Sequence, residues 1–126
     1  MKTKSKKSLK TQADKLWAKI IGSKQFCEVC GKQGHNSHHI IGRINHVVRW
    51  DLRNGCYLCI GCHFKAHNDP IEFIDWFKSN RADDYYYLYE KRKEFVVLTK
   101  DYYEGVITHL KDILEYEDDL QEVKKL

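Results

Sequence analysis

The sequence predicts an α+β fold: a small metal-binding module of short strands, with a helix before it and a helical extension after it. Two C-x-x-C pairs lie far apart in the chain, which is typical of a structural metal site with four thiolate ligands: Cys27, Cys30, Cys59 and Cys62. The loop-rich sequence between the pairs buries little apolar surface, so this part needs a metal to be stable. Apolar residues recur at helical spacing in residues 8–22 and again after residue 69, which predicts flanking helices.

The length of 126 residues fits one compact domain spanning residues 1–126. Within this domain we expect a module over residues 8–68, which includes the N-terminal helix, and a helical extension over residues 69–126. Asp69-Pro70 combines an N-cap residue with a proline in the first turn, so it predicts the start of the extension.

Charge is distributed unevenly along the chain. The formal net charge is +4, with lysines crowded at the start, arginines in the middle and acidic residues over 115–122. This asymmetry favours a polyanionic partner for the N-terminal half and the middle of the chain. The alternative for the lysine-rich start is a solvated arm without a partner.

Cysteine usage favours zinc over disulfides. The five cysteines are an odd number, and the chain shows neither a secretory signal nor an apolar run of the ~20 residues that a membrane span needs. We therefore expect an intracellular, cytoplasmic protein with no membrane partner and reduced thiols that bind structural Zn²⁺. Cys59 and Cys62 are preferred over the overlapping Cys56-x-x-Cys59 pair because they lie at a strand-to-helix turn, which leaves Cys56 as a buried small hydrophobe.

The segment between the cysteine pairs predicts a β-hairpin followed by a helix. Residues 37–41 are strand-like, and residues 42–54 are too irregular for a helix and form the hairpin loop. A second strand follows, and residues 61–68 have helical character. His63 and His67 then lie one turn apart on one helix face.

Four histidines are candidates for a second site. His38 and His39 are adjacent, so on a strand they point to opposite faces. His38 can share a metal ion with His63 and His67. The alternative for any single histidine is an exposed or satisfied core residue, which is our interpretation of three others: His35, His46 and His109.

These residues resemble a known motif. The order His38-His39-Ile40-Ile41, then Asn54, then Cys59-Ile60-Gly61-Cys62-His63 resembles the HNH endonuclease motif of the ββα-metal fold, over roughly residues 26–68. His63-x-x-x-His67 is similar to the arrangement in colicin-type nuclease domains. His38 stands where many members of the family have an aspartate, and many members lack a counterpart of His67.

The wider chain resembles the phage NinG/Rap recombination proteins. The shared features are a Lys-Leu-Trp helix at residues 15–17, a C-x-x-C-G knuckle, the run of residues 48–54 and a helical C-terminal part.

The HNH resemblance implies a zinc-stapled ββα-metal module that acts as a metal-dependent DNA endonuclease. It would hydrolyse phosphodiester bonds. The NinG/Rap resemblance implies a setting in phage recombination or DNA processing, with branched DNA as a candidate substrate. His38, His63 and His67 would bind a catalytic divalent metal, which could be Mg²⁺, Mn²⁺, Ni²⁺ or Zn²⁺. His39 would be the general base on the attacking water, and Asn54 would tie the hairpin loop and so fix that base.

Several features leave alternatives open. Arg43, Arg49 and Arg53 lie in the hairpin loop and could bind DNA phosphates, although for Arg49 and Arg53 a solvated loop is an equal alternative. A non-catalytic zinc-dependent DNA-binding module is the alternative function. Thr99 is the candidate cap of a last, long helix, and the C-terminal helices could form a homodimer.

Overall fold

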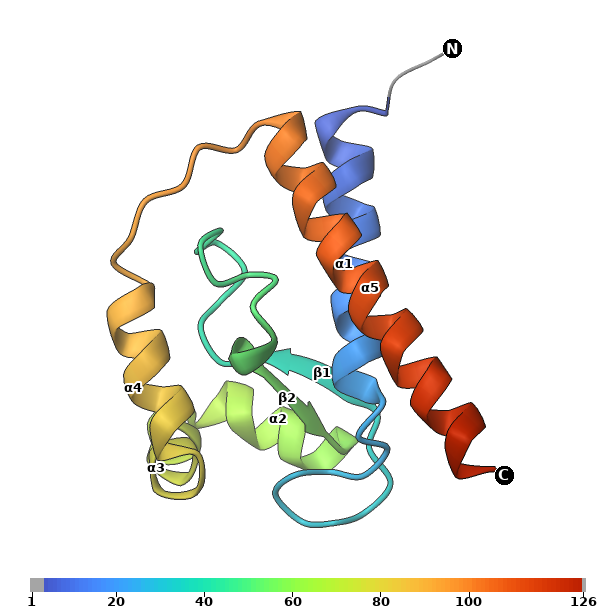
Figure 1. Cartoon of the computed structure of the whole chain (residues 1–126). Coiled ribbons are helices and arrows are strands. Elements are labelled where there is room, and N and C mark those ends of the chain that lie inside the picture. Colours follow the sequence, from blue (N-terminus) through green and yellow to red (C-terminus); the bar gives the residue numbers. More distant parts are fainter. Residues whose placement is uncertain (1–3, 126) are drawn as a thin grey trace. The chain divides into compact units, whose positions relative to one another are not determined.

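The computed structural model describes residues 4–125, which form five α-helices, one 3-10 helix and a two-stranded antiparallel sheet (Figure 1). The predicted α+β class is confirmed. The elements follow one another in this order: α1 (Lys6–Gly22), β1 (Asn36–His39), η1 (Leu52–Asn54), β2 (Gly55–Leu58), α2 (Ile60–Asn68), α3 (Pro70–Asn80), α4 (Ala82–Lys91) and α5 (Lys100–Lys124).

The chain forms two compact units. One contains α1 as far as Ile20 together with the residues from Val97 onward, and the other runs from Ile21 to Val96. The hairpin, α2, α3 and α4 all belong to the second unit, in which α3 packs on α2 and α4 packs on α3. The expected single domain over residues 1–126 and its division at residue 69 stay predictions.

The helical unit has a periodic apolar side. In the part of α1 that belongs to this unit, the buried residues are Leu9, Ala13, Trp17 and Ile20, and on α5 they are Tyr103, Ile107 and Leu110. Both sets follow the three- and four-residue spacing of one helix face. Thr99 caps α5 as predicted, because its side chain accepts a hydrogen bond from the Tyr102 N–H. The homodimer through the C-terminal helices stays a prediction.

The β-hairpin forms where the sequence predicts it. β1 pairs antiparallel with β2, in a register that sets His38 opposite Cys56 and His39 opposite Gly55. Residues 40–54 form the loop, whose end is the single turn η1. Asp51 caps this turn through a hydrogen bond from the Arg53 N–H to its side chain.

Two capped helices follow the hairpin. Cys59 is the N-cap of α2, and its sulfur accepts from the Cys62 N–H. Asp69 is the N-cap of α3, where its carboxylate accepts from the Glu72 N–H and a proline occupies the first turn, as predicted. The helices and the hairpin share a small core of buried residues: Cys27, Cys56, Leu58, Ala66 and Phe73.

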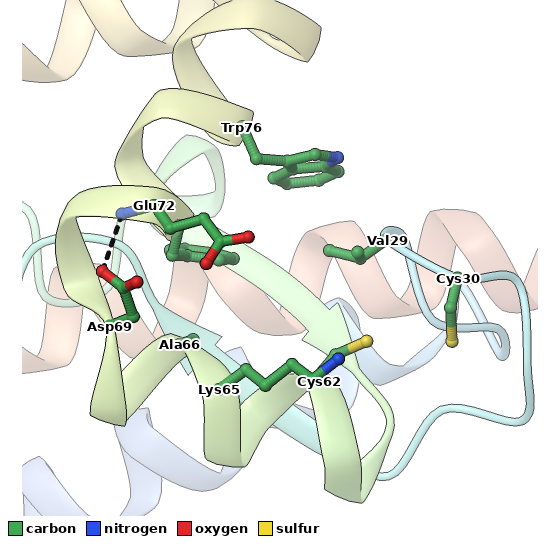
Figure 2. Close-up of a pocket in the computed structure, with 9 residues that line it drawn as sticks. Val29, Cys30, Cys62, Lys65, Ala66, Asp69, Glu72 and Trp76 are labelled. Atoms are coloured by element: carbon green, nitrogen blue, oxygen red, sulfur yellow. Dashed lines mark hydrogen bonds between the residues drawn. The ribbon is translucent and has the colours of Figure 1, made fainter.

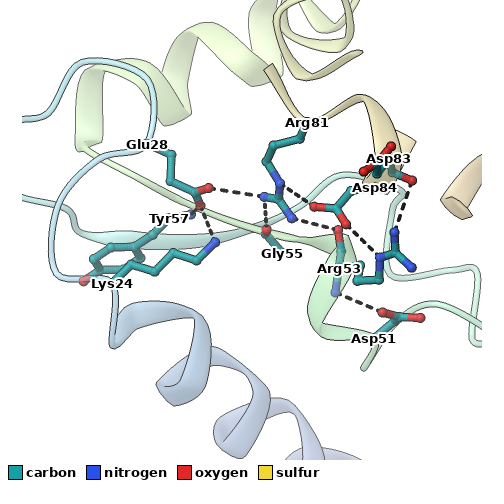
Figure 3. Close-up of polar contacts among 9 residues, drawn as sticks. All are labelled: Lys24, Glu28, Asp51, Arg53, Gly55, Tyr57, Arg81, Asp83 and Asp84. Carbon is teal, nitrogen blue, oxygen red and sulfur yellow. Dashed lines mark hydrogen bonds and ion pairs between the residues drawn. The ribbon is translucent and has the colours of Figure 1, made fainter. Parts of the chain in front are cut away.

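Arg81 joins the helices to the hairpin (Figure 3). This residue lies between α3 and α4, and its guanidinium donates to the carbonyl oxygens of Gly55 at 2.7 Å and Arg53 at 3.1 Å. The same group pairs with the carboxylates of Asp84 at 2.8 Å and Glu28 at 3.3 Å. β2, the first cysteine knuckle and the start of α4 are therefore held by one planar cation.

Among residues 4–125, no helix is both long enough and apolar enough to cross a membrane.

Candidate metal centres

Four cysteines meet at one point of the second unit. The sulfur atoms of Cys27, Cys30, Cys59 and Cys62 all lie within 4.8 Å of one another. The Cys30 and Cys59 sulfurs are 3.6 Å apart. A tetrahedral zinc ion with Zn–S bonds of about 2.3 Å holds its sulfurs about 3.8 Å apart. The four closely spaced cysteines could therefore hold a structural metal ion such as zinc.

Two different turns supply these ligands. The first pair lies in a tight loop closed by a bridge between Phe26 and Gln33. Gly31 follows the pair with a φ of 78°, a left-handed conformation that favours glycine, and its N–H donates to the Cys27 carbonyl at 2.9 Å. The second pair occupies the N-cap and the first turn of α2, where backbone N–H groups point at sulfur.

The four thiols cannot all ionise easily, because a thiolate at one cysteine disfavours a thiolate at its neighbours. Burial raises the pKa of Cys27, but backbone N–H groups of Cys30, Cys59 and Val29 outweigh burial and bring that pKa to about 6. Burial and the neighbouring thiols instead raise the pKa of Cys62 to about 12. Four thiolates cannot coexist at this distance without a compensating cation, and a divalent ion removes this conflict.

Cys56 lies apart from the four ligands. It is fully buried, and burial together with the Glu28 carboxylate raises the pKa of its thiol. This environment suits a small hydrophobic residue, as the sequence predicts.

Three histidines converge at a second point of the same unit. β1 supplies His38, and α2 supplies His63 and His67 from successive turns. One ring nitrogen of each lies within 4.8 Å of the others, and the Nε2 atoms of His63 and His67 are 3.0 Å apart. Imidazoles on one tetrahedral zinc ion, with Zn–N bonds of about 2.0–2.1 Å, hold their nitrogens about 3.3 Å apart. The three predicted ligands are thus brought together, in an arrangement compatible with a shared ion.

Two imidazoles of the cluster, those of His38 and His63, are favoured in the neutral form. Burial, together with the charges of His63, His67 and His39, lowers the pKa of His38 to about 4. Burial also lowers the pKa of His63, with His67 as the second cause. The neutral form is the one that donates a lone pair to a metal.

His39 lies beside this cluster with its ring held by the loop. Its Nε2 is 3.0 Å from the carbonyl oxygen of Arg49. A carbonyl oxygen only accepts hydrogen bonds, so Nε2 carries the proton and Nδ1 is the basic nitrogen. His38 and His39 line one concavity together with Ser37, Gly42, Arg43, His63 and His67.

Asn54 closes the hairpin loop. Its side chain is fully buried, accepts from the Ile41 N–H at 2.8 Å and donates to the Ile41 carbonyl at 3.0 Å. The Asn54 carbonyl also accepts from the Ile40 N–H at 2.9 Å. Asn54 therefore ties the residues that directly follow His39 to the start of β2.

Compared with protein-family models, with curated proteins and with solved structures, the chain gives no match in any of the three. The HNH and NinG/Rap resemblances rest on short sequence motifs alone.

The three predicted DNA-contacting arginines have different environments. Arg43 is exposed and lines the histidine concavity. Arg49 is only 7% exposed, donates to the Arg43 carbonyl at 3.3 Å and lies against the Trp50 ring. Arg53 pairs with Asp84 at 2.7 Å, and its guanidinium carbon lies 4.0 Å from the centre of the Tyr87 ring. The structure brings Arg43 to the concavity, and burial or ion pairing engages Arg49 and Arg53 elsewhere.

Phe73 contacts the histidine cluster and also lines the pocket beside the cysteines. Its ring centre lies 5.1 Å from that of His38 and 5.7 Å from that of Trp76. On the Trp76 side, a pocket opens between α2, α3 and the first cysteine knuckle, and Val29, Lys65 and Glu72 are among the residues that line it (Figure 2). The histidine concavity is thus a distinct surface from the pocket beside the cysteines.

The sequence alone did not identify Arg81 or Phe73 as neighbours of the site. Arg81 reaches carbonyl groups 26 and 28 residues away, and no local pattern signals such contacts. Phe73 could be found by its position, because it follows Asp69 by one helical turn and so faces back toward α2.

Proposed function

We propose that this chain is a metal-dependent DNA endonuclease of the HNH type that hydrolyses phosphodiester bonds. The observation that carries the proposal is the convergence of His38, His63 and His67, with His39 in the same concavity. β1, β2 and α2 follow one another as a ββα-metal module requires. The four-cysteine cluster is suited to a structural zinc ion that would stabilise this module.

The three clustered imidazoles would hold the catalytic divalent ion. Such an ion, when bound, polarises a phosphodiester and offsets negative charge on the leaving 3′ oxygen. His39 takes a proton from the attacking water through Nδ1, because the Arg49 carbonyl keeps the proton on Nε2. Asn54 positions His39 through Ile41 and does no chemistry itself. The products are a 5′ phosphate and a 3′ hydroxyl.

Arg43 is the phosphate contact that this geometry favours, because it is exposed and lines the concavity. Phage recombination or DNA processing is the proposed setting, and branched DNA the candidate substrate, on the strength of the NinG/Rap resemblance.

The test is nicking of supercoiled plasmid with Mg²⁺, Mn²⁺, Ni²⁺ or Zn²⁺. We expect the wild type to nick and His39→Ala to lose nicking while keeping its bound metal, since His39 is outside both ligand clusters. His35→Ala, which changes an exposed histidine outside the concavity, is the matched control and should nick like wild type. Equal nicking by wild type and His39→Ala would reject the assigned base.

The same assay decides between the two candidate functions. If the protein binds DNA only in the presence of zinc and nicks it with none of the four metals, the endonuclease is overturned and the non-catalytic zinc-dependent module is supported. Four-way junctions and linear duplexes of equal length test the branched-DNA preference.

A further inference from the structure

Two large apolar side chains of α2 face solvent. Ile60 is 66% exposed and Phe64 is 68% exposed. They lie one helical turn apart and therefore on one face of the helix. We call this pair the α2 ridge. A single exposed apolar residue is ordinary, but a neighbouring pair of this size suggests a contact surface.

The α2 ridge runs directly beside two residues of the histidine cluster. Ile60 precedes His63 by three positions, and Phe64 precedes His67 by three. Residues three apart on an α-helix are surface neighbours, with Cβ atoms about 5–6 Å apart. A molecule that reaches both histidines therefore also meets the ridge.

The charge on and beside α2 favours an anionic partner. α2 has the sequence IGCHFKAHN, which contains no aspartate or glutamate, and its one lysine, Lys65, lines the pocket beside the cysteines. Arg43 lines the adjoining concavity. A surface that combines exposed apolar groups, cationic groups and no carboxylate on its own helix complements a nucleic-acid strand, whose phosphates are anionic and whose bases are apolar on their faces.

We propose that the α2 ridge contacts DNA bases, with Phe64 acting as a wedge against a base step next to the phosphate held at the histidine cluster. Ile60 packs on the neighbouring nucleotide. This inference rests on the proposed function, because it places the DNA by the position of the histidines. A wedge of this kind separates stacked bases, which costs free energy in intact duplex and much less where the bases are already unstacked. Phe64 would thus favour junctions and other distorted DNA over regular duplex.

The test is DNA binding by His39→Ala protein, which keeps the ridge and does not cleave. The probe is a four-way junction, or a matched duplex, that carries 2-aminopurine, a base whose fluorescence rises when it loses its stacking neighbours. We expect fluorescence to rise on binding, and the additional change Phe64→Ala to abolish the rise and weaken binding about 5- to 100-fold. Phe64→Trp should retain both effects, because it keeps an aromatic wedge.

Ile71→Ala is the matched control. Ile71 is a large apolar residue of α3 that is 79% exposed, and it lies outside the histidine concavity. We expect it to leave binding and fluorescence unchanged. Because Phe64 is largely exposed, Phe64→Ala should keep wild-type helicity and zinc content, so that weaker binding cannot be assigned to unfolding.

Three results would overturn the wedge. The first is a Phe64→Ala variant that binds the probe as tightly as its parent, and the second is binding without any change in 2-aminopurine fluorescence. The third is a wild-type dimer in sedimentation that Phe64→Ala dissociates, which would assign the ridge to a second copy of the chain. Any of these results, obtained for a protein whose wild type nicks plasmid, would reject the wedge alone, whereas Phe64-dependent binding without any nicking would reject the endonuclease alone.

Discussion

The side chain of Asn54 binds both backbone groups of Ile41. Its oxygen accepts the Ile41 N–H at 2.8 Å and its nitrogen donates to the Ile41 carbonyl at 3.0 Å. The pair closes the hairpin loop two residues after His39. Since Asn54 is fully buried, water cannot replace these bonds when the side chain changes.

Asn54→Ala should therefore destabilise the fold. The substitution leaves the N–H and the carbonyl of Ile41 without their partners, which costs about 2–4 kcal/mol in the free energy of unfolding. Urea unfolding of the zinc-loaded protein measures this change. Asn80→Ala is the control, because the Asn80 amide also donates to a backbone carbonyl, at 2.8 Å, but is exposed. Equal losses in the two variants would contradict the role of Asn54.

Arg81 supports the same loop from outside. It donates to the carbonyls of Arg53 and Gly55, the two neighbours of Asn54 in the sequence, and pairs with Glu28 and Asp84 (Figure 3). Arg81→Ala should lower the free energy of unfolding by about 2–3 kcal/mol. Arg81→Lys should recover little of this loss, because an ammonium group cannot make the divergent contacts of a planar guanidinium.

A control for Arg81 is available at the C-cap of α4. Arg92 is exposed and lies over the Tyr89 ring at 4.7 Å. Arg92→Ala should change the unfolding free energy by no more than about 0.5 kcal/mol. A double-mutant cycle with Asp84→Asn measures the coupling between Arg81 and Asp84, and zero coupling would show that the ion pair adds no stability.

Local interactions explain why much of the structure could be predicted. The caps at Asp69 and Thr99 each join groups three residues apart, so the residue types alone indicate them. The cysteine pairs and His63-x-x-x-His67 are likewise short-range patterns, and the structure brings each set together.

Long-range packing explains what could not be predicted. Arg49 and Arg53 both belong to a basic loop, yet one is buried and the other pairs with Asp84, which is 31 residues away. The environment of Arg53 depends on where α4 packs on η1, and no spacing in the sequence encodes this. The Arg81 contacts are unpredictable for the same reason.

The phenol of Tyr87 should lose its proton at a higher pH than an exposed tyrosine does. Burial and the hydrogen bond from its O–H to Asp51 raise its pKa from 10.0 to about 12. A pKa raised on folding contributes stability that is fully present below pH 10 and is lost as the pH rises toward 12. Ultraviolet absorbance of phenolate should show a late step that Tyr87→Phe removes. Tyr116→Phe, which changes a tyrosine that is 65% exposed, should leave that step in place. Loss of the late step in Tyr116→Phe would contradict its assignment to Tyr87.

Removing a bound zinc ion should unfold the second unit, which runs from Ile21 to Val96. We expect its loop-rich sequence to depend on a metal bound at the four-cysteine cluster, so a strong chelator should abolish its cooperative unfolding transition.

Cobalt substitution shows which cysteines bind the metal, because cobalt bound to thiolates has charge-transfer absorption. Cys27→Ala should weaken these bands and Cys56→Ala should keep them, since Cys56 lies outside the cluster. Loss of the bands in Cys56→Ala would show that the overlapping pair supplies the ligands.

Arg43 and Arg49 should separate DNA binding from stability. Arg43 is exposed in the histidine concavity, so Arg43→Ala should weaken binding of all DNA sequences alike and reduce the salt dependence of log Kd by about 1. Arg49→Ala should instead lower the unfolding free energy, because its buried side chain packs on Trp50 and donates to the Arg43 carbonyl. The backbone carbonyl of Arg49 holds His39, so a loosened loop should also lower the nicking rate without changing the salt dependence. An unchanged salt dependence in Arg43→Ala would remove Arg43 from the DNA interface.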